Sequence, residues 1–214
     1  DGIECEQGFF LTHGWDKKIP PRAIENLGTD FLFPEIKYKF HACCHGLHSF
    51  LEALDEMKLE NNFNPETIEE IAIETNPSWL KVCNIEEPKT GLESKFSYKL
   101  TAAMSIYGKD TSNLDTYSDE ICFDDKLNNI RDKVRVIPND NLSNTQSLIS
   151  IKDGSSNVKN KHDLSDKIEN NILETKIVNK SVSLLSETKS NQISKILNAP
   201  NENKVDALVD CLVS

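Results

Sequence analysis

The most informative stretch of the sequence is KFHACCHGLHSFLEAL, residues 39–54. Apolar and basic residues alternate just ahead of it and into its first positions, which predicts a strand over residues 35–41. From about Cys44 to Leu59, apolar side chains recur at intervals of three and four residues, which predicts an amphipathic helix. The stretch therefore predicts a strand that turns into a helix, with the helix beginning within two residues of Cys44.

The turn between these two elements is rich in side chains that can carry chemistry. It holds three of the five histidines and two of the six cysteines. Lys37 and Lys39 precede them on one strand face, because side chains alternate along a strand. The N-terminus of a helix offers unpaired N–H groups, which favour a carboxylate ligand and lower the pKa of a thiol. These are the parts of a carboxylate-binding acid/base site.

Two other interpretations of the same turn stay open. Cys44 and His48 lie one helical turn apart beside an apolar stripe, where a small buried thiol and a hydrogen-bonded histidine are common. A zinc site is the other alternative, since the turn holds four residues of ligand type, namely His41, Cys44, His45 and His48. Against zinc, the turn has no CxxC pair, and a helix does not easily aim residues 44, 45 and 48 at one ion.

A second run, TGLESKFSYKLTAAM at residues 90–104, follows about forty residues later. Its apolar residues recur at helical spacing, which predicts a helix over residues 96–107. The buried side of that helix is predicted to hold Phe96, Leu100, Ala103 and Met104. Gly108 ends the helix in the position that a C-cap glycine prefers.

The middle of the chain mixes strands and helices. Strands are predicted over residues 68–75, 134–137 and 148–151, and Asp153-Gly154 is a hairpin turn signal after the last of them. Short helices are expected at residues 22–27 and 124–133.

After Ser155 the composition shifts to Asn, Ser and Lys. Leu164, Ile168 and Ile172 keep helical spacing, whereas residues 174–198 are weakly patterned. A last helix is predicted after Pro200 from one apolar stripe of Val205, Leu208, Val209 and Leu212. Together these elements predict an α+β domain with a helical C-terminal extension.

Composition limits the class of protein. The 214 residues carry a net charge of −11, and a phosphate-backbone binder normally carries a basic surface, so no nucleic-acid partner is expected. No apolar run approaches the ~20 residues that a membrane span needs, so no membrane partner is expected either. Six cysteines, two of them adjacent, are too sparse for a disulfide scaffold, which predicts reduced thiols and a cytoplasmic location. The chain begins at Asp1 without a signal-peptide pattern.

The two runs at residues 39–54 and 90–104 together resemble the second half of the MmgE/PrpD family. That family includes 2-methylcitrate dehydratase, cis-aconitate decarboxylase and iminodisuccinate epimerase. Its members share a lysine, a Cys or His five residues on, and a His four further, which here fall on Lys39, Cys44 and His48. The KFS at residues 95–97, after a Thr-Gly, is a second family landmark.

The resemblance covers residues 1 to about 154 and has two departures. Leu100 stands where some relatives carry Tyr, and Cys44 stands where those relatives carry His. The form KFHACCHGLH is more similar to the epimerase-like branch than to the decarboxylase.

The resemblance implies an α+β fold: an inserted α+β domain of the MmgE/PrpD type at residues 31–165. The tail of a helical domain would precede it at residues 1–30, and a C-terminal helical segment would follow at residues 166–214. Both flanks would belong to an all-helical domain whose larger, N-terminal part is missing from this chain. That missing domain is one expected partner, and a second copy is another, since members of the family are commonly homodimers.

The resemblance further implies a lyase or isomerase that needs no cofactor and acts on a small di- or tricarboxylate. Such a reaction removes a proton next to a carboxylate, so it needs a base and cations that hold the substrate. Cys44 is the expected acid/base group, and His48 orients it or lines the pocket. The expected substrate-binding residues are Lys39 first, then Lys37, Lys95, His41 and His45.

The resemblance also implies that these 214 residues by themselves have little or no activity, because the family site is completed by the helical domain. The alternative hypothesis is a truncated, non-catalytic fragment or an interaction module that retains the fold only.

Overall fold

The structure, a computed structural model, describes residue 26 and residues 28–31, 36–200 and 204–213. The chain divides into two units, residues 1–37 and 38–214, and the second holds every described helix and strand. Apart from Asn26, the helix predicted at residues 22–27 lies outside the described residues.

Four strands form one mixed sheet in the order β2-β1-β3-β4. They are β1 (Ile68–Thr75), β2 (Val134–Pro138), β3 (Gln146–Asp153) and β4 (Ser156–Asp163). β1 pairs in parallel with β2 and antiparallel with β3, and β3 forms a hairpin with β4. The three predicted strands and the turn at Asp153-Gly154 are therefore confirmed.

The sheet has one apolar face and one polar face. Ile71 in the central strand β1 pairs with Val134 of β2 and Ile151 of β3, and all three side chains are buried. At the next position along β1, Ala72 pairs with Arg135 of β2 and Ser150 of β3, and these side chains lie on the opposite face of the sheet. Because side chains alternate along each strand, only the apolar face of the sheet needs helices packed against it to exclude water.

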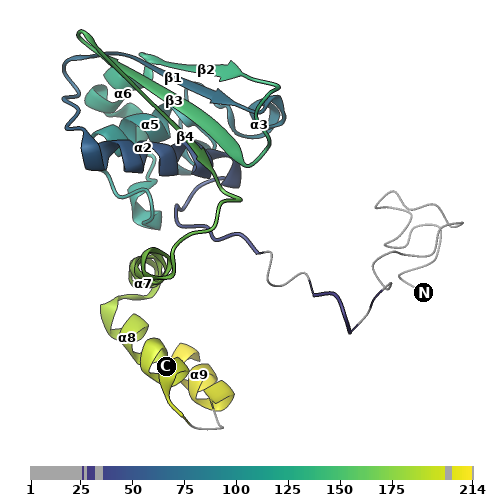
Figure 1. The fold of residues 1–214 in the computed structure, drawn as a ribbon. Helices are drawn as coiled ribbons and strands as arrows, with labels where there is room; N and C mark the ends of the chain where they lie inside the picture. The colour runs from purple at the N-terminus through teal and green to yellow at the C-terminus, as the bar shows by residue number, and fades with distance from the viewer. Residues whose placement is uncertain (1–25, 27, 32–35, 201–203, 214) are drawn as a thin grey trace, which may run out of the picture. The chain divides into compact units, whose positions relative to one another are not determined.

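Three helices supply that cover: α2 (His48–Glu60), α5 (Tyr98–Ile106) and α6 (Asp125–Arg131). Figure 1 shows them layered against one side of the sheet. Phe50, Leu54 and Leu100 are fully buried between helices and sheet. Burying a side chain of this size contributes about 1.5–3 kcal/mol, so this layer contains the core of the domain.

The helix predicted from Cys44 begins as one turn of 3-10 helix, η3 (His45–Leu47), and continues as α2. Cys44 is the N-cap of η3, which confirms the predicted start. The strand predicted ahead of it is wrong, because residues 36–40 form no strand in the structure. Alternation makes a segment suitable for a sheet, but a strand also needs a neighbour to share its hydrogen bonds.

The second predicted helix is α5, which begins two residues later than predicted, and a separate short helix, α4 (Gly91–Ser94), precedes it. The side chain of Ser97 caps α5 by accepting a hydrogen bond from the Leu100 N–H at 3.2 Å. Phe96 therefore lies before the helix and is only half-buried, which corrects its predicted place on the buried face. The other predicted core residues of this helix, Leu100, Ala103 and Met104, are fully buried.

Gly108 ends α5 as predicted, at a φ of +68° that favours glycine. Its N–H bonds to the Ser105 carbonyl at 3.0 Å, and the next N–H, of Lys109, bonds to the Met104 carbonyl at 2.9 Å. This pair of bonds is a Schellman motif, which satisfies the last carbonyls of the helix.

Shorter elements connect these parts: α3 (Pro77–Cys83), η4 (Leu114–Thr116) and η5 (Glu120–Phe123). The short charged helix predicted at residues 124–133 is α6. Asp124 caps it, with its carboxylate accepting hydrogen bonds from the N–H groups of Lys126 and Leu127.

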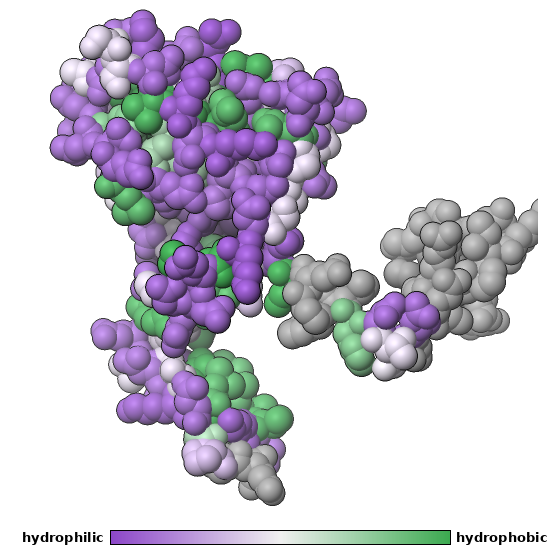
Figure 2. All heavy atoms as spheres, in the orientation of Figure 1, coloured by the Kyte–Doolittle hydropathy of each residue, from purple (hydrophilic) through white to green (hydrophobic). Residues whose placement is uncertain are grey.

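Three helices follow β4: α7 (Asn170–Leu185), α8 (Glu187–Asn198) and α9 (Lys204–Val213). The helical spacing that begins at Leu164 is realised only from Asn170 onward, and α9 is the predicted last helix. Its apolar stripe is exposed, with Val205 at 74% and Val209 and Leu212 at 51%. Figure 2 shows hydrophobic residues gathered over the C-terminal helices. Within the described part of the chain, no helix has the length and apolar character of a membrane span.

Candidate functional site

The candidate site is a pocket of about 400 Å³ between the KFHACCHGLH turn, the α4–α5 corner, the η4 region and α7. We call it the lysine pocket. It is lined by Lys39, His41, Ala42, Cys43, Cys44, Leu92, Lys95, Phe96, Leu114 and Lys180. Three of these are lysines, and no aspartate or glutamate is found among these lining residues. In a chain of net charge −11, this pocket is a local concentration of positive charge.

Hydrogen bonds of the main chain join the two sequence motifs at this pocket. The turn is not a strand, so its N–H groups need partners elsewhere. The Cys44 N–H donates to the Lys95 carbonyl at 2.9 Å, and the Ala42 N–H donates to the Thr111 carbonyl at 2.8 Å. The first bond connects the turn directly to the KFS landmark, although some fifty residues separate them.

Two glycines allow this close approach. A Cβ on Gly91 would lie 2.1 Å from the carbonyl oxygen of Tyr117, where no side chain fits. A Cβ on Gly46 would lie 2.5 Å from the Trp79 ring and 2.8 Å from the Cys83 sulfur. The glycines of both motifs are therefore required by packing against other segments.

His41 is buried and held at both ring nitrogens. Its Nδ1 lies 2.7 Å from the Thr111 hydroxyl, and its Nε2 lies 3.2 Å from the Glu52 carboxylate. Glu52 also accepts a hydrogen bond from the ammonium of Lys176 on α7. Burial by itself raises the Glu52 pKa, but the hydrogen bonds from His41 and Lys176 outweigh it and lower that pKa to about 2.

His48 lies behind the pocket and does not line it. Its Nδ1 is 3.1 Å from the Cys44 carbonyl, and its buried Nε2 has no hydrogen-bond partner in the described structure. Burial, with the nearby His41, lowers the His48 pKa to about 3. The ring is therefore neutral at ordinary pH, and Nδ1–H donates to the carbonyl because only a donor satisfies that oxygen.

The two adjacent cysteines differ in access. Cys43 is buried, and burial raises its pKa to about 12. Cys44 is half-buried at the lining of the same pocket. Cys83, behind it, is fully buried, and its pKa is also raised to about 12 by burial. Of these three thiols, Cys44 is the most exposed.

The three lysines come from three different parts of the fold. Lys39 is exposed at the entry to the turn. Lys95 lies between α4 and α5, with its ammonium 5.6 Å from the centre of the Tyr117 ring. Lys180 lies on α7 and donates a 2.7 Å hydrogen bond to the Ser112 carbonyl. Sequence reasoning missed Lys180, which stands in the weakly patterned region, and no motif there could have revealed it.

The structure thus brings Lys39, Lys95, His41 and Cys44 together and leaves three predicted site residues outside the pocket. Lys37 is exposed and belongs to the other unit of the chain. The His45 ring packs 5.3 Å from His48 and 6.4 Å from Trp79.

The free helix N-terminus expected at Cys44 is not what the structure shows. The Cys44 N–H is bonded to Lys95, and α2 begins at His48 behind the fully buried N-cap Leu47. Positive charge at the pocket therefore comes from lysine side chains. For the zinc alternative, the residues that the structure describes include no group of three or more His, Cys, Asp or Glu side chains placed to hold a metal ion.

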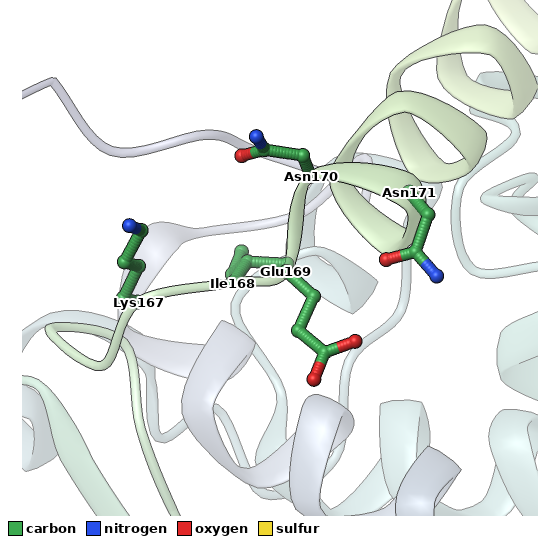
Figure 3. A pocket seen from close by; sticks show the side chains of 5 residues that line it. All are labelled: Lys167, Ile168, Glu169, Asn170 and Asn171. Carbon is green, nitrogen blue, oxygen red and sulfur yellow. The ribbon is translucent and has the colours of Figure 1, made fainter.

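A larger hollow, of about 540 Å³, lies where the chain passes from β4 to α7. It is lined by Lys167, Ile168, Glu169, Asn170 and Asn171. Figure 3 shows that these side chains come from one continuous stretch and point in different directions. A binding site needs groups that converge on one ligand, so the lysine pocket is the better candidate.

Comparison with known protein families matches residues 41–199 to the MmgE/PrpD C-terminal domain. Every residue that lines the lysine pocket except Lys39 lies within this match. A search of curated proteins found no match to the chain. The family match covers well over half of the 214 residues. It contains the second motif, the first motif from His41 onward and the mixed sheet, so this chain belongs to the MmgE/PrpD family, through its C-terminal domain.

Proposed function

We propose that this chain forms part of a cofactor-independent lyase or isomerase that acts on a small di- or tricarboxylate. The reaction removes a proton next to a carboxylate, in a dehydration, a decarboxylation or an epimerisation. One observation carries the proposal: the lysine pocket gathers three ammonium groups and an accessible thiol, with no carboxylate in its lining. Such a pocket attracts polyanions and repels cations.

The lysines bind the substrate and stabilise charge in this mechanism. Lys39 and Lys95 pair with substrate carboxylates and hold the molecule beside Cys44. When a proton leaves the carbon next to a carboxylate, negative charge spreads onto the carboxylate oxygens. Ammonium groups already placed there stabilise that charge more strongly than water does.

Cys44 carries the proton. As thiolate, its sulfur takes the proton from carbon, and as thiol it returns a proton to the substrate. His48 acts through the main chain, since its Nδ1–H bond holds the Cys44 carbonyl and with it the direction of the thiol. His41, held by Thr111 and Glu52, keeps one wall of the pocket in place. These two histidines are positioning residues in this proposal.

Thiol labelling of the 214-residue chain tests the site. We expect iodoacetamide to modify Cys44 at least ~10-fold faster than Cys43 or Cys83, whose burial raises their pKa to about 12. Propane-1,2,3-tricarboxylate should protect Cys44 and leave Cys211, which lies outside the pocket lining, unprotected. Labelling of Cys44 no faster than that of Cys83, without protection, would remove Cys44 from the mechanism.

Proton exchange tests the reaction itself. Di- and tricarboxylates are incubated in D₂O with the chain, alone and together with an N-terminal helical domain of the same family, and the carbon-bound protons are followed by NMR. We expect exchange next to a carboxylate with the combined protein, little with the chain alone, and loss of exchange in Cys44→Ser. A Cys211→Ser variant is the matched control and should exchange normally.

The alternative is an interaction module that keeps the fold without catalysis, and the exposed apolar stripe of α9 favours it. This candidate predicts no exchange with any carboxylate under either condition. It also predicts that charge-removing variants of the lysine pocket leave every measured property of the chain unchanged except stability.

A further inference from the structure

Helix α7 presents two lysines to the α+β domain, one helical turn apart. Residues four apart lie on the same face of a helix, and the side chains of both Lys176 and Lys180 are half-buried. Lys176 bonds to the Glu52 carboxylate, and its ammonium lies 5.1 Å from the centre of the Phe40 ring. This contact holds α7 against α2, which places the next turn of the helix at the lysine pocket.

Lys180 reaches the lysine pocket from that next turn. Its ammonium has three donors, and within the described residues one of them is used, in the 2.7 Å bond to the Ser112 carbonyl. Burial lowers the Lys180 pKa, as does the charge of Lys39, while Asp110 and Cys43 act in the opposite direction. An ammonium that is partly buried beside another ammonium is stabilised by an anion that contacts both.

We propose that Lys180 is a third carboxylate-binding residue of the lysine pocket, and that a bound polycarboxylate holds α7 to the α+β domain. The ligand would bridge Lys180 on α7 to Lys39 and Lys95 on the domain. The inference rests on the proposed function in taking a carboxylate as the ligand. It assigns a binding role to a helix that carries neither sequence motif.

Titration calorimetry of the whole 214-residue chain with propane-1,2,3-tricarboxylate at low salt is the first test. Lys180→Met removes a charge-assisted hydrogen bond to the ligand, so it should weaken binding by about 10-fold or more. Lys180→Arg, which keeps the charge, should bind within a few-fold of the unchanged chain. Lys195→Met removes one charge from an exposed position on α8 and should leave the affinity unchanged, as a matched control.

The Lys176→Met variant distinguishes a direct contact between Lys180 and the ligand from a requirement that α7 be docked on the α+β domain. It removes the link between α7 and Glu52 without removing a charge from the lysine pocket. If Lys180 contacts the ligand, Lys180→Met weakens binding clearly more than Lys176→Met does. Equal loss in the two variants would mean that α7 only needs to be docked, and the binding role of Lys180 would be wrong.

Hydrogen exchange of the α7 amides is the second test, because it reports on the helix directly. The tricarboxylate should slow exchange in α7 of the unchanged chain and of Lys195→Met, and have no effect on α7 in Lys180→Met. Binding that leaves α7 exchange unchanged overturns the inference while the proposed function stands. Absence of any tricarboxylate binding by the unchanged chain, with circular dichroism showing it folded, overturns both.

Discussion

Single glycines determine whether the two motifs can meet. The Gly91 N–H donates to the Asp119 carboxylate at 2.7 Å, and its Cα packs against the Tyr117 carbonyl. The residue is followed by the KFS landmark, whose Lys95 carbonyl accepts the bond from Cys44. A side chain at position 91 would push this corner away from the turn and widen the pocket.

Replacing Gly91 by alanine should lower the free energy of unfolding by about 3 kcal/mol, because the new Cβ meets a backbone oxygen that cannot move alone. Urea unfolding followed by circular dichroism measures this. Gly108→Ala is the matched control, since open space surrounds it and only its positive φ resists a side chain. We expect that variant to cost about 1 kcal/mol. Equal effects of the two variants would contradict the packing argument.

At the scale of elements, α2 connects the site to α7 through one buried carboxylate. Glu52 lies in the middle of α2, only 5% exposed, between His41 on the turn and Lys176 on α7. A buried carboxylate without partners is very costly, so this position is stable only because both partners are present. The α2–α7 contact and the orientation of His41 therefore depend on the same side chain.

Glu52→Gln should destabilise the chain by about 2 kcal/mol, less than the ~3–5 kcal/mol of a fully buried pair, because the Lys176 side chain is still 31% exposed. Glu60→Gln, at the exposed end of α2, removes the same charge and should change stability by less than about 0.5 kcal/mol. Chemical unfolding measures both. Hydrogen exchange should also quicken in α7 for Glu52→Gln alone, and unchanged exchange there would contradict the docking role.

At the scale of the whole molecule, stability depends on pH through groups buried near the site. His48 has a folded-state pKa of about 3, below its ordinary 6.5, and Glu52 has one of about 2, below its ordinary 4.5. In both cases the unfolded chain binds a proton that the folded chain does not. The free energy of unfolding therefore falls on acidification, from His48 below pH 6.5 and additionally from Glu52 below pH 4.5.

Between pH 7 and pH 5, His48 should account for a loss of about 2 kcal/mol. Urea titrations at the two pH values measure the total change, and His48→Leu gives the control. That variant should lose about 2 kcal/mol less over the same interval, because leucine does not titrate. An identical pH dependence of the two chains would mean that His48 is not held in its neutral form.

Elements whose apolar residues repeat at a regular interval can be predicted from the amino-acid sequence. α2, β1 and β3 are predictable because each buries a face made by its own neighbouring residues, and Gly108 is predictable because the left-handed region favours glycine. The two motifs likewise placed Lys39, Cys44 and Lys95 in one region of a family fold before the structure showed that they line one pocket.

Contacts between elements that are far apart in the sequence become visible only in the folded structure. The alternating residues 36–40 form no strand, because strand formation depends on a partner that local alternation does not provide. The Lys176–Glu52 pair joins positions 124 residues apart in the sequence. Lys180 enters the lysine pocket from the same helix, α7, which no sequence motif marks. Such contacts arise from packing between elements, so no local sequence pattern predicts them.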